Sequence, residues 1–172
     1  MPRFSGRSRP RLCADQQEKG VFVRACRKED LSEAKEILES SPEAGHWSVA
    51  SLEASLQEHK NYFLSALQNE HIAGFIVGRR IAEEGEILNV AVKFEFRRKG
   101  MGKALVQAVL EVFRSEGVAR VFLEVRESNA PAIAMYENLG FQEIGKRPGY
   151  YRDPNEAALV LALEIGTVST YR

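Results

Sequence analysis

Residues 97–103 gather the residue types that bind a phosphate at the start of a helix. The segment follows a predicted strand, opens a strongly amphipathic pattern, and carries four cationic side chains around Gly100 and Gly102. Glycines let the backbone turn tightly and let a ligand approach the amides closely. Free N–H groups and the positive end of a helix dipole favour an anion, so this turn predicts a pyrophosphate site.

Two other phosphate motifs do not fit this turn. A dinucleotide fingerprint needs a third glycine where the chain has Leu105. A P-loop needs Ser or Thr after Gly102 and Lys103, and the chain has Ala104 there. On the glycines alone, a solvated basic helix start remains the alternative to a ligand site.

Two further side chains could move protons. Glu124 alternates with Leu123 and Val125 in a predicted strand, so it points to the opposite face. It is either an ordinary carboxylate on the wetter face or a general base. Tyr136 lies two turns into the next predicted helix, and it is either a half-buried core tyrosine or a proton donor.

The elements that must position these residues follow the order β-α-α-β-β-β-α-β-α-β-β. The predicted strands are 21–25, 62–67, 72–79, 86–92, 121–126, 141–144 and 157–165, and the predicted helices begin near residues 29, 48, 101 and 129. Turns are expected at Asn69-Glu70 and at Glu84-Gly85, and Leu88, Val90 and Val92 are expected on one face. Hairpins combined with crossovers predict an α+β fold, with a mixed twisted sheet of about seven strands and about four flanking helices.

Composition limits the class of protein. The 172 residues suit a single domain, expected at 20–166, between a disordered basic tail at 1–19 and a short tail at 167–172. Lys plus Arg equals Asp plus Glu at 24 each, which gives no reason to expect binding to nucleic acid or membrane. Cys13 and Cys26 are expected to be free thiols, which fits the cytoplasm. The three histidines have no metal-binding spacing, so no metal is expected.

The pattern Arg97-x-x-Gly100-x-Gly102 matches the Gln/Arg-x-x-Gly-x-Gly/Ala motif of GNAT acetyltransferases. Residues 88–92 and 123–136 resemble one branch of that superfamily, the bacterial ribosomal-protein-alanine N-acetyltransferases. The similarity runs from about residue 21 to residue 165, and it includes the pair Trp47-Ser48 and residues 149–151. The resemblance implies the GNAT fold and transfer of an acetyl group from acetyl-CoA to a protein's N-terminal amine, with a ribosomal protein as a candidate acceptor.

The resemblance also implies a role for individual positions. Glu124 would be the base and Tyr136 the acid, while Tyr150 and Tyr151 would line the acceptor groove or simply pack over the core. The backbone of residues 90–92 would hold the acetyl and pantetheine groups. The residues implied to bind the cofactor are Val90, Ala91, Val92, Arg97, Arg98, Lys99, Gly100, Met101, Gly102, Lys103, Asn129 and Tyr136.

Two other functions remain open at this point. The same fold could acetylate a small amine or a lysine side chain, because only the acceptor groove would differ. A non-catalytic module that binds acyl-CoA is the other alternative, although the presence of both Glu124 and Tyr136 favours an enzyme.

Overall fold

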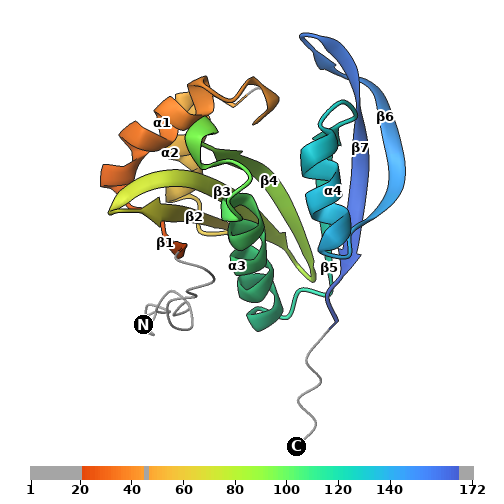
Figure 1. Cartoon of the computed structure of the whole chain (residues 1–172). Helices are drawn as coiled ribbons and strands as arrows, with labels where there is room; N and C mark the ends of the chain where they lie inside the picture. Colours follow the sequence, from red (N-terminus) through yellow and green to blue (C-terminus); the bar gives the residue numbers. More distant parts are fainter. Residues whose placement is uncertain (1–20, 45–46, 167–172) are drawn as a thin grey trace, which may run out of the picture.

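A seven-stranded mixed sheet forms the centre of the molecule. The computed structural model describes residues 21–44 and 47–166, so the expected tails at 1–19 and 167–172 lie outside the described residues. The strand order is β1-β2-β3-β4-β5-β7-β6, and every neighbouring pair is antiparallel except β4 and β5 (Figure 1). This arrangement confirms the predicted α+β class and the mixed sheet.

The elements are β1 (Phe22–Ala25), η1 (Lys28–Asp30), α1 (Leu31–Glu39), η2 (Pro42–Ala44), α2 (Val49–Gln57), β2 (Asn61–Gln68), β3 (His71–Ile81), β4 (Glu84–Val92), η3 (Phe94–Phe96), α3 (Met101–Ser115), β5 (Arg120–Arg126), α4 (Ala130–Asn138), β6 (Gln142–Arg152) and β7 (Asn155–Glu164).

Two hydrophobic cores lie on the two faces of the sheet. Helices α1 and α2 cover one face, where Ile37 and Phe75 are fully buried. Helix α3 packs on the other face through its predicted apolar stripe, with Leu105 and Phe113 fully buried. Helix α4 lies beside the half of the sheet formed by β5, β6 and β7 (Figure 1). Among the residues described, no helix is both long and apolar enough to cross a bilayer.

One predicted hairpin turn is confirmed and the other is wrong. Asn69 and Glu70 both have positive φ, as a two-residue hairpin turn favours. The second turn falls at residues 82–83 rather than at Glu84-Gly85, since Ile81 pairs with Glu84. Gly85 lies inside β4, where a Cβ would come within 2.8 Å of the Phe113 ring. That glycine therefore serves the packing of α3 on the sheet and not the turn.

A bulge in β4 divides the sheet. Gly78 pairs with Ile87 and Val77 pairs with Asn89, so Leu88 is an extra residue in β4. Leu88 consequently packs with the α1 core, while Val90 and Val92 pack with the α3 core. The expectation that these three residues share one face is wrong, because the bulge interrupts the alternation.

The parallel ladder between β4 and β5 ends where this bulge begins. Its four pairs run from Glu84↔Arg120 to Ile87↔Leu123, although both strands continue beyond them. From Leu88 onward, the edge of β4 that faces β5 pairs with no strand in the part of the chain that the structure describes. Figure 1 shows β4 and β5 diverging toward the ends at which α3 and α4 begin.

Strand β6 is longer than the sequence predicted. It spans Gln142–Arg152 instead of 141–144, and it pairs with β7 along most of this length. The tyrosine pair Tyr150-Tyr151 therefore belongs to the strand and does not follow it. Pro148 and Gly149, which conceal this strand in the sequence, lie in an irregular stretch between Arg147 and Tyr151.

Candidate active site

The start of α3 offers free backbone amides. Gly100 is the N-cap residue with φ +86°, and no side chain caps the helix. The first helical hydrogen bond is donated by the Ala104 N–H to the Gly100 carbonyl at 2.9 Å. The amides of residues 101–103 precede this bond, and at a helix N-terminus such groups favour an anion.

The two glycines of this turn meet different surroundings. A Cβ at Gly100 would meet nothing within 4 Å, so Gly100 is required for its left-handed backbone alone. A Cβ at Gly102 would lie 3.2 Å from Sδ of Met135, a residue of α4. Gly102 therefore lets the start of α3 approach α4 closely on the side where the sheet divides.

The four cations around the turn separate into two groups. Arg97 points back into the protein, where Nε donates to the Val92 carbonyl at 3.0 Å and Nη2 lies 2.5 Å from a Glu43 oxygen. Arg98, Lys99 and Lys103 are exposed and form no ion pair with a described residue. Those three side chains can face a bound anion, whereas the Arg97 side chain ties β4 to the segment between α1 and α2.

A second side chain holds the same segment in place. Asn89 is 5% exposed, and its amide donates to the Ala44 carbonyl at 2.7 Å. Its carbonyl oxygen is buried and has no hydrogen-bond partner among the described residues. The bulge at Leu88 turns Asn89 toward the α1 side, so β4 and η2 together form one wall beside the divided sheet.

Glu124 lies where the alternation of β5 predicted. Val121, Leu123 and Val125 are buried in the α3 core, and Glu124 is on the opposite face with its side chain 25% exposed. Nη1 of Arg147 donates to its carboxylate. Hydrogen bonding to Glu124 also raises the pKa of Tyr150 to about 12. The Glu124 carboxylate is therefore partly exposed, and two side chains of β6, Arg147 and Tyr150, contact it.

Tyr136 is buried on α4 with its ring edge-on to Phe141 at 5.7 Å between centroids. Burial raises the pKa of its phenol well above 10, so the hydroxyl stays protonated at neutral pH. Within the described residues, that hydroxyl has no hydrogen-bond partner. It can therefore donate a proton to a group that enters the site.

Tyr151 is the common neighbour of the two proton-transfer candidates. Its phenol interacts electrostatically with Glu124 and with Tyr136. Its ring lies 4.0 Å beneath the Arg126 guanidinium. Burial raises the pKa of Tyr151, which therefore remains neutral at pH 7. Glu124 on β5 and Tyr136 on α4 thus share Tyr151 as an electrostatic neighbour.

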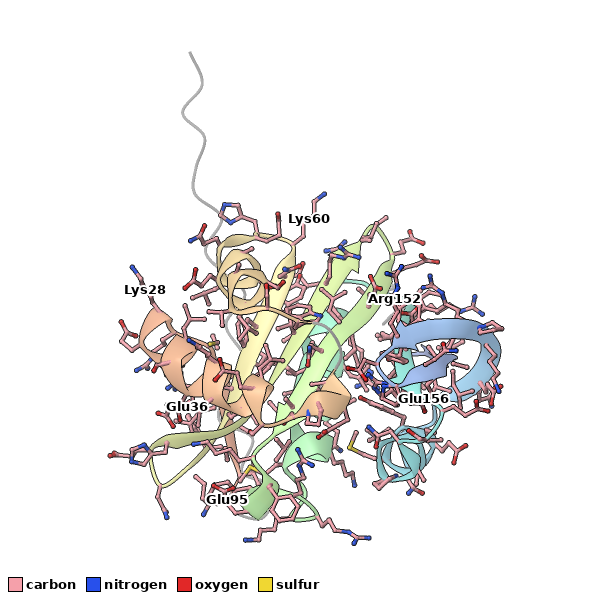
Figure 2. All side chains as sticks on the ribbon, turned by 90° about the horizontal axis from the view of Figure 1, so that it is seen from above. Lys28, Glu36, Lys60, Glu95, Arg152 and Glu156 are labelled. Carbon is pink, nitrogen blue, oxygen red and sulfur yellow. The ribbon has the colours of Figure 1, made fainter. Side chains whose placement is uncertain are left out.

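The turn between β5 and α4 is held by the hairpin of β6 and β7. The Asn129 side chain accepts from the Ala132 N–H at 3.3 Å and caps α4, as the sequence predicted. The Ser128 N–H donates to a Glu156 carboxylate oxygen at 2.5 Å, and hydrogen bonds from the side chain and the backbone of Ser128 lower the pKa of Glu156. Figure 2 shows Glu156 and Arg152 at this hairpin, away from Glu36 of α1.

Sequence reasoning missed Arg147, Arg126 and Asn89. Arg147 was hidden because β6 appeared to end at residue 144, and its contact with Glu124 crosses β7. The spacing of Arg, Tyr and Glu residues along the chain was the only signal in the sequence that could have indicated the contacts of Arg147 and Arg126. No rule of local periodicity links residues 23 positions apart in the chain.

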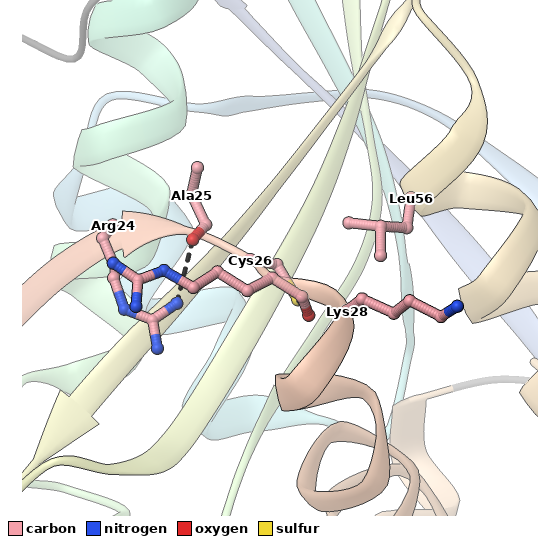
Figure 3. A pocket seen from close by; sticks show the side chains of 6 residues that line it. Arg24, Ala25, Cys26, Lys28 and Leu56 are labelled. Atoms are coloured by element: carbon pink, nitrogen blue, oxygen red, sulfur yellow. Dashed lines mark hydrogen bonds between the residues drawn. The ribbon is translucent and has the colours of Figure 1, made fainter.

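A cavity elsewhere in the fold does not belong to this site. It encloses about 420 Å³ at the end of β1, on the edge of the sheet away from β6, and is lined by Arg24, Ala25, Cys26, Arg27, Lys28 and Leu56 (Figure 3). Burial raises the pKa of the Cys26 thiol to about 11, so it is not a ready nucleophile. Cys13 and His46 lie outside the described residues. Within the part described, no three potential ligands gather to hold a metal ion.

Comparison with known proteins identifies relatives along most of the chain. Residues 27–141 match the model of the acetyltransferase (GNAT) family. The ribosomal protein bS18-alanine N-acetyltransferase of Escherichia coli K12 is 38% identical over 138 residues, which cover 79% of this chain and 92% of the relative. The enzyme of the same name from Haemophilus influenzae is 32% identical over 143 residues, which cover 81% and 94%.

Solved structures share the fold. The crystal structure of the Escherichia coli ribosomal-protein-S18-alanine N-acetyltransferase matches with a TM-score of 0.76 and 31% identity, over 88% of this chain and 99% of the other. Arabidopsis thaliana NAA60, solved in complex with acetyl-CoA, matches with a TM-score of 0.75 over 84% and 98%. At 17% identity, the second match concerns the fold alone.

Proposed function

The chain belongs to the acetyltransferase (GNAT) family, and from that premise we propose that it transfers the acetyl group of acetyl-CoA to the N-terminal α-amine of a protein. The observation that carries this proposal is that a carboxylate on β5, Glu124, and a protonated phenol on α4, Tyr136, share Tyr151 as a neighbour. A ribosomal protein is the proposed acceptor, because relatives with 38% and 32% identity are bS18-alanine N-acetyltransferases. The proposed place of action is the cytoplasm, where ribosomal proteins are made.

The residues present fit an acyl-CoA. The uncapped amides at the start of α3, with Arg98, Lys99 and Lys103 exposed around them, suit a diphosphate. The unpaired edge of β4 from Leu88 onward can hydrogen-bond an amide-containing pantetheine arm in the manner of a missing strand. Asn129 lies at the start of α4 and is the proposed contact of the pantetheine arm. When bound there, the cofactor supplies an activated acetyl thioester.

Glu124 and Tyr136 divide the proton transfers. An α-ammonium has a pKa near 8 and must lose a proton before its nitrogen can attack a carbonyl carbon. Glu124 accepts that proton directly or through one water. Tyr136 donates its hydroxyl proton to sulfur as the carbon–sulfur bond breaks, and the second amine proton restores the phenol. One proton leaves per turnover, which balances amide and thiol formation.

Direct transfer fits the chain better than an acetylated enzyme does. A covalent route needs a thiolate or an activated hydroxyl beside the thioester. Cys26 lies on β1's side of the sheet, and burial keeps its thiol protonated. Glu124 can instead act on the amine of a ternary complex.

The first experiment should identify the acetylated atom. The protein is incubated with acetyl-CoA and three peptides: one with a free N-terminal Ala and no Lys, one with a blocked N-terminus and an internal Lys, and one with both ends blocked and no Lys. Thiol release and fragment mass spectra should show acetylation of the free α-amine alone. Acetylation of Lys alone would favour the side-chain alternative. Tight acetyl-CoA binding without release would favour a binding module.

A further inference from the structure

An irregular stretch of β6 brings two side chains across β7. Arg147 pairs with Ala158 and Tyr151 pairs with Glu156, so residues 148–150 of β6 stand opposite a single residue of β7. Gly149 takes φ +61° within this stretch. Bulges of this kind re-aim side chains. Here the re-aimed Arg147 and Tyr150 reach Glu124 on β5, which is separated from β6 by β7.

The Arg147 guanidinium packs on a tyrosine ring through one face and makes a hydrogen bond through one of its nitrogen atoms. Its carbon lies 4.3 Å from the centroid of the Tyr150 ring, and Nη1 donates to Glu124. A guanidinium has five N–H donors, and no other acceptor for them lies among the described residues. The side chain is 56% exposed, next to the Glu124 carboxylate. Its remaining donors therefore face the space that an acceptor must cross to reach Glu124.

A peptide N-terminus can offer a group to each of Glu124 and Arg147. In a peptide, one carbon atom separates the α-amine from the first carbonyl group. An acceptor amine that hydrogen-bonds Glu124 consequently places that carbonyl oxygen beside the group that was in contact with Glu124. A lysine ε-amine and a simple alkylamine carry no carbonyl at this distance.

We propose that Arg147 recognises the first carbonyl oxygen of the acceptor peptide. As the amine takes its place on Glu124, the guanidinium moves from the carboxylate to that oxygen while it stays on the Tyr150 ring. Arg147 is thus a specificity-determining residue that favours peptide N-termini over lysine side chains and small amines. The inference rests on the proposed function and adds the feature of the acceptor that the site reads.

A double-mutant cycle between the enzyme and the substrate tests this assignment. The acceptor peptide begins with Ala, and its partner carries a thioamide at the first peptide bond, because sulfur is a weaker hydrogen-bond acceptor than oxygen. The enzymes are the unchanged chain, Arg147→Gln, Arg147→Lys and Arg152→Gln. Arg152 is the matched control because it is an exposed arginine of the same strand. The measured quantity is the oxo-to-thio ratio of kcat/KM.

The unchanged chain and Arg152→Gln should both prefer the oxo peptide by about 10-fold, as expected for one hydrogen bond to a charged donor. The ratio should fall to about 1 to 2 in Arg147→Gln and lie between these values in Arg147→Lys, which keeps the charge without the planar fork. An Arg147→Gln variant that slows both peptides equally would overturn the inference and leave the proposed function intact. Acetylation of neither peptide by the unchanged chain would overturn the proposed function itself.

Discussion

Two clusters in the same half of the sheet contain the same three residue types. In one, the Arg126 guanidinium lies 4.0 Å from the Tyr151 ring and pairs with Glu156 at 3.2 Å. In the other, the Arg147 guanidinium lies 4.3 Å from the Tyr150 ring and pairs with Glu124.

Exposure separates the buried cluster from the open one. The side chains of Arg126 and Glu156 are 7% and 13% exposed, and those of Arg147 and Glu124 are 56% and 25% exposed. Arg126 also donates to the Asp153 carbonyl at 3.2 Å, so its polar groups are engaged within the protein. A buried arginine of this kind supports the fold, whereas an open one keeps donors for a ligand.

Removal of the carboxylate from the open cluster should have the largest effect. Glu124→Gln should lower kcat/KM for an N-terminal Ala peptide by about 10²- to 10⁴-fold, the usual contribution of a general base. Glu127→Gln is the matched control, because Glu127 also pairs with a β6 cation, Lys146, but lies outside the site. Initial rates of thiol release measure both variants. A Glu124→Gln variant as active as Glu127→Gln would end the assignment of the base.

Substitution of the two arginines should affect different properties, the stability of the fold for Arg126 and the activity for Arg147. Arg126→Gln should lower the free energy of unfolding by about 2 kcal/mol, because it removes a buried charge from its partners. The loss is at the lower end for a buried pair, since Glu156 keeps the Ser128 amide. Arg147→Gln should leave the urea midpoint unchanged, because exposed ion pairs contribute little. Equal midpoint shifts in the two variants would contradict the distinction between the clusters.

Removal of the Tyr136 hydroxyl tests the proposed acid. Tyr136→Phe should lower kcat by about 10- to 100-fold, since the departing sulfur loses its proton donor. The unfolding midpoint should stay the same or rise, because no described residue hydrogen-bonds the lost hydroxyl. Stopped-flow rates and thermal unfolding measure the two quantities. Unchanged kcat would show that solvent supplies the proton.

The smallest effect is spectroscopic and concerns Tyr150. Its pKa is raised from 10 to about 12, chiefly through its hydrogen bond to Glu124. The folded state holds this proton more tightly than the unfolded chain, so the stabilisation is present below pH 10 and is lost as the pH rises toward 12. The ultraviolet difference between the unchanged chain and Tyr150→Phe should titrate near pH 12. In a Glu124→Gln background, the same ultraviolet difference should titrate at a lower pH. A transition at an unchanged pH would show that Glu124 does not raise the pKa of Tyr150.

Much of the fold could be predicted because local patterns determine it. The 3.6-residue period of α3 and the caps Ser48 and Asn129 appear in the structure where the sequence placed them. The position of Glu124 followed from a two-residue alternation that no bulge interrupts. For these elements, neighbours along the chain contain the necessary information.

The parts that could not be predicted depend on long-range packing. The bulge at Leu88 conforms to no local rule, and it decides both the division of the sheet and the direction of Asn89. Gly85 is a residue type typical of turns, but in the structure it leaves room for the Phe113 ring. Arg147 contacts Glu124 only because β7 pairs with both β5 and β6.

The decisive measurement is a crystal structure with a conjugate of coenzyme A and an Ala-starting peptide. We expect the diphosphate on the amides at the start of α3, and the linked sulfur and amine between Tyr136 and Glu124. We also expect that Arg147 has left Glu124 for the first carbonyl oxygen of the peptide. A conjugate bound away from Glu124 and Tyr136, with the α3 amides free, would show that the acetyl transfer does not take place at these residues.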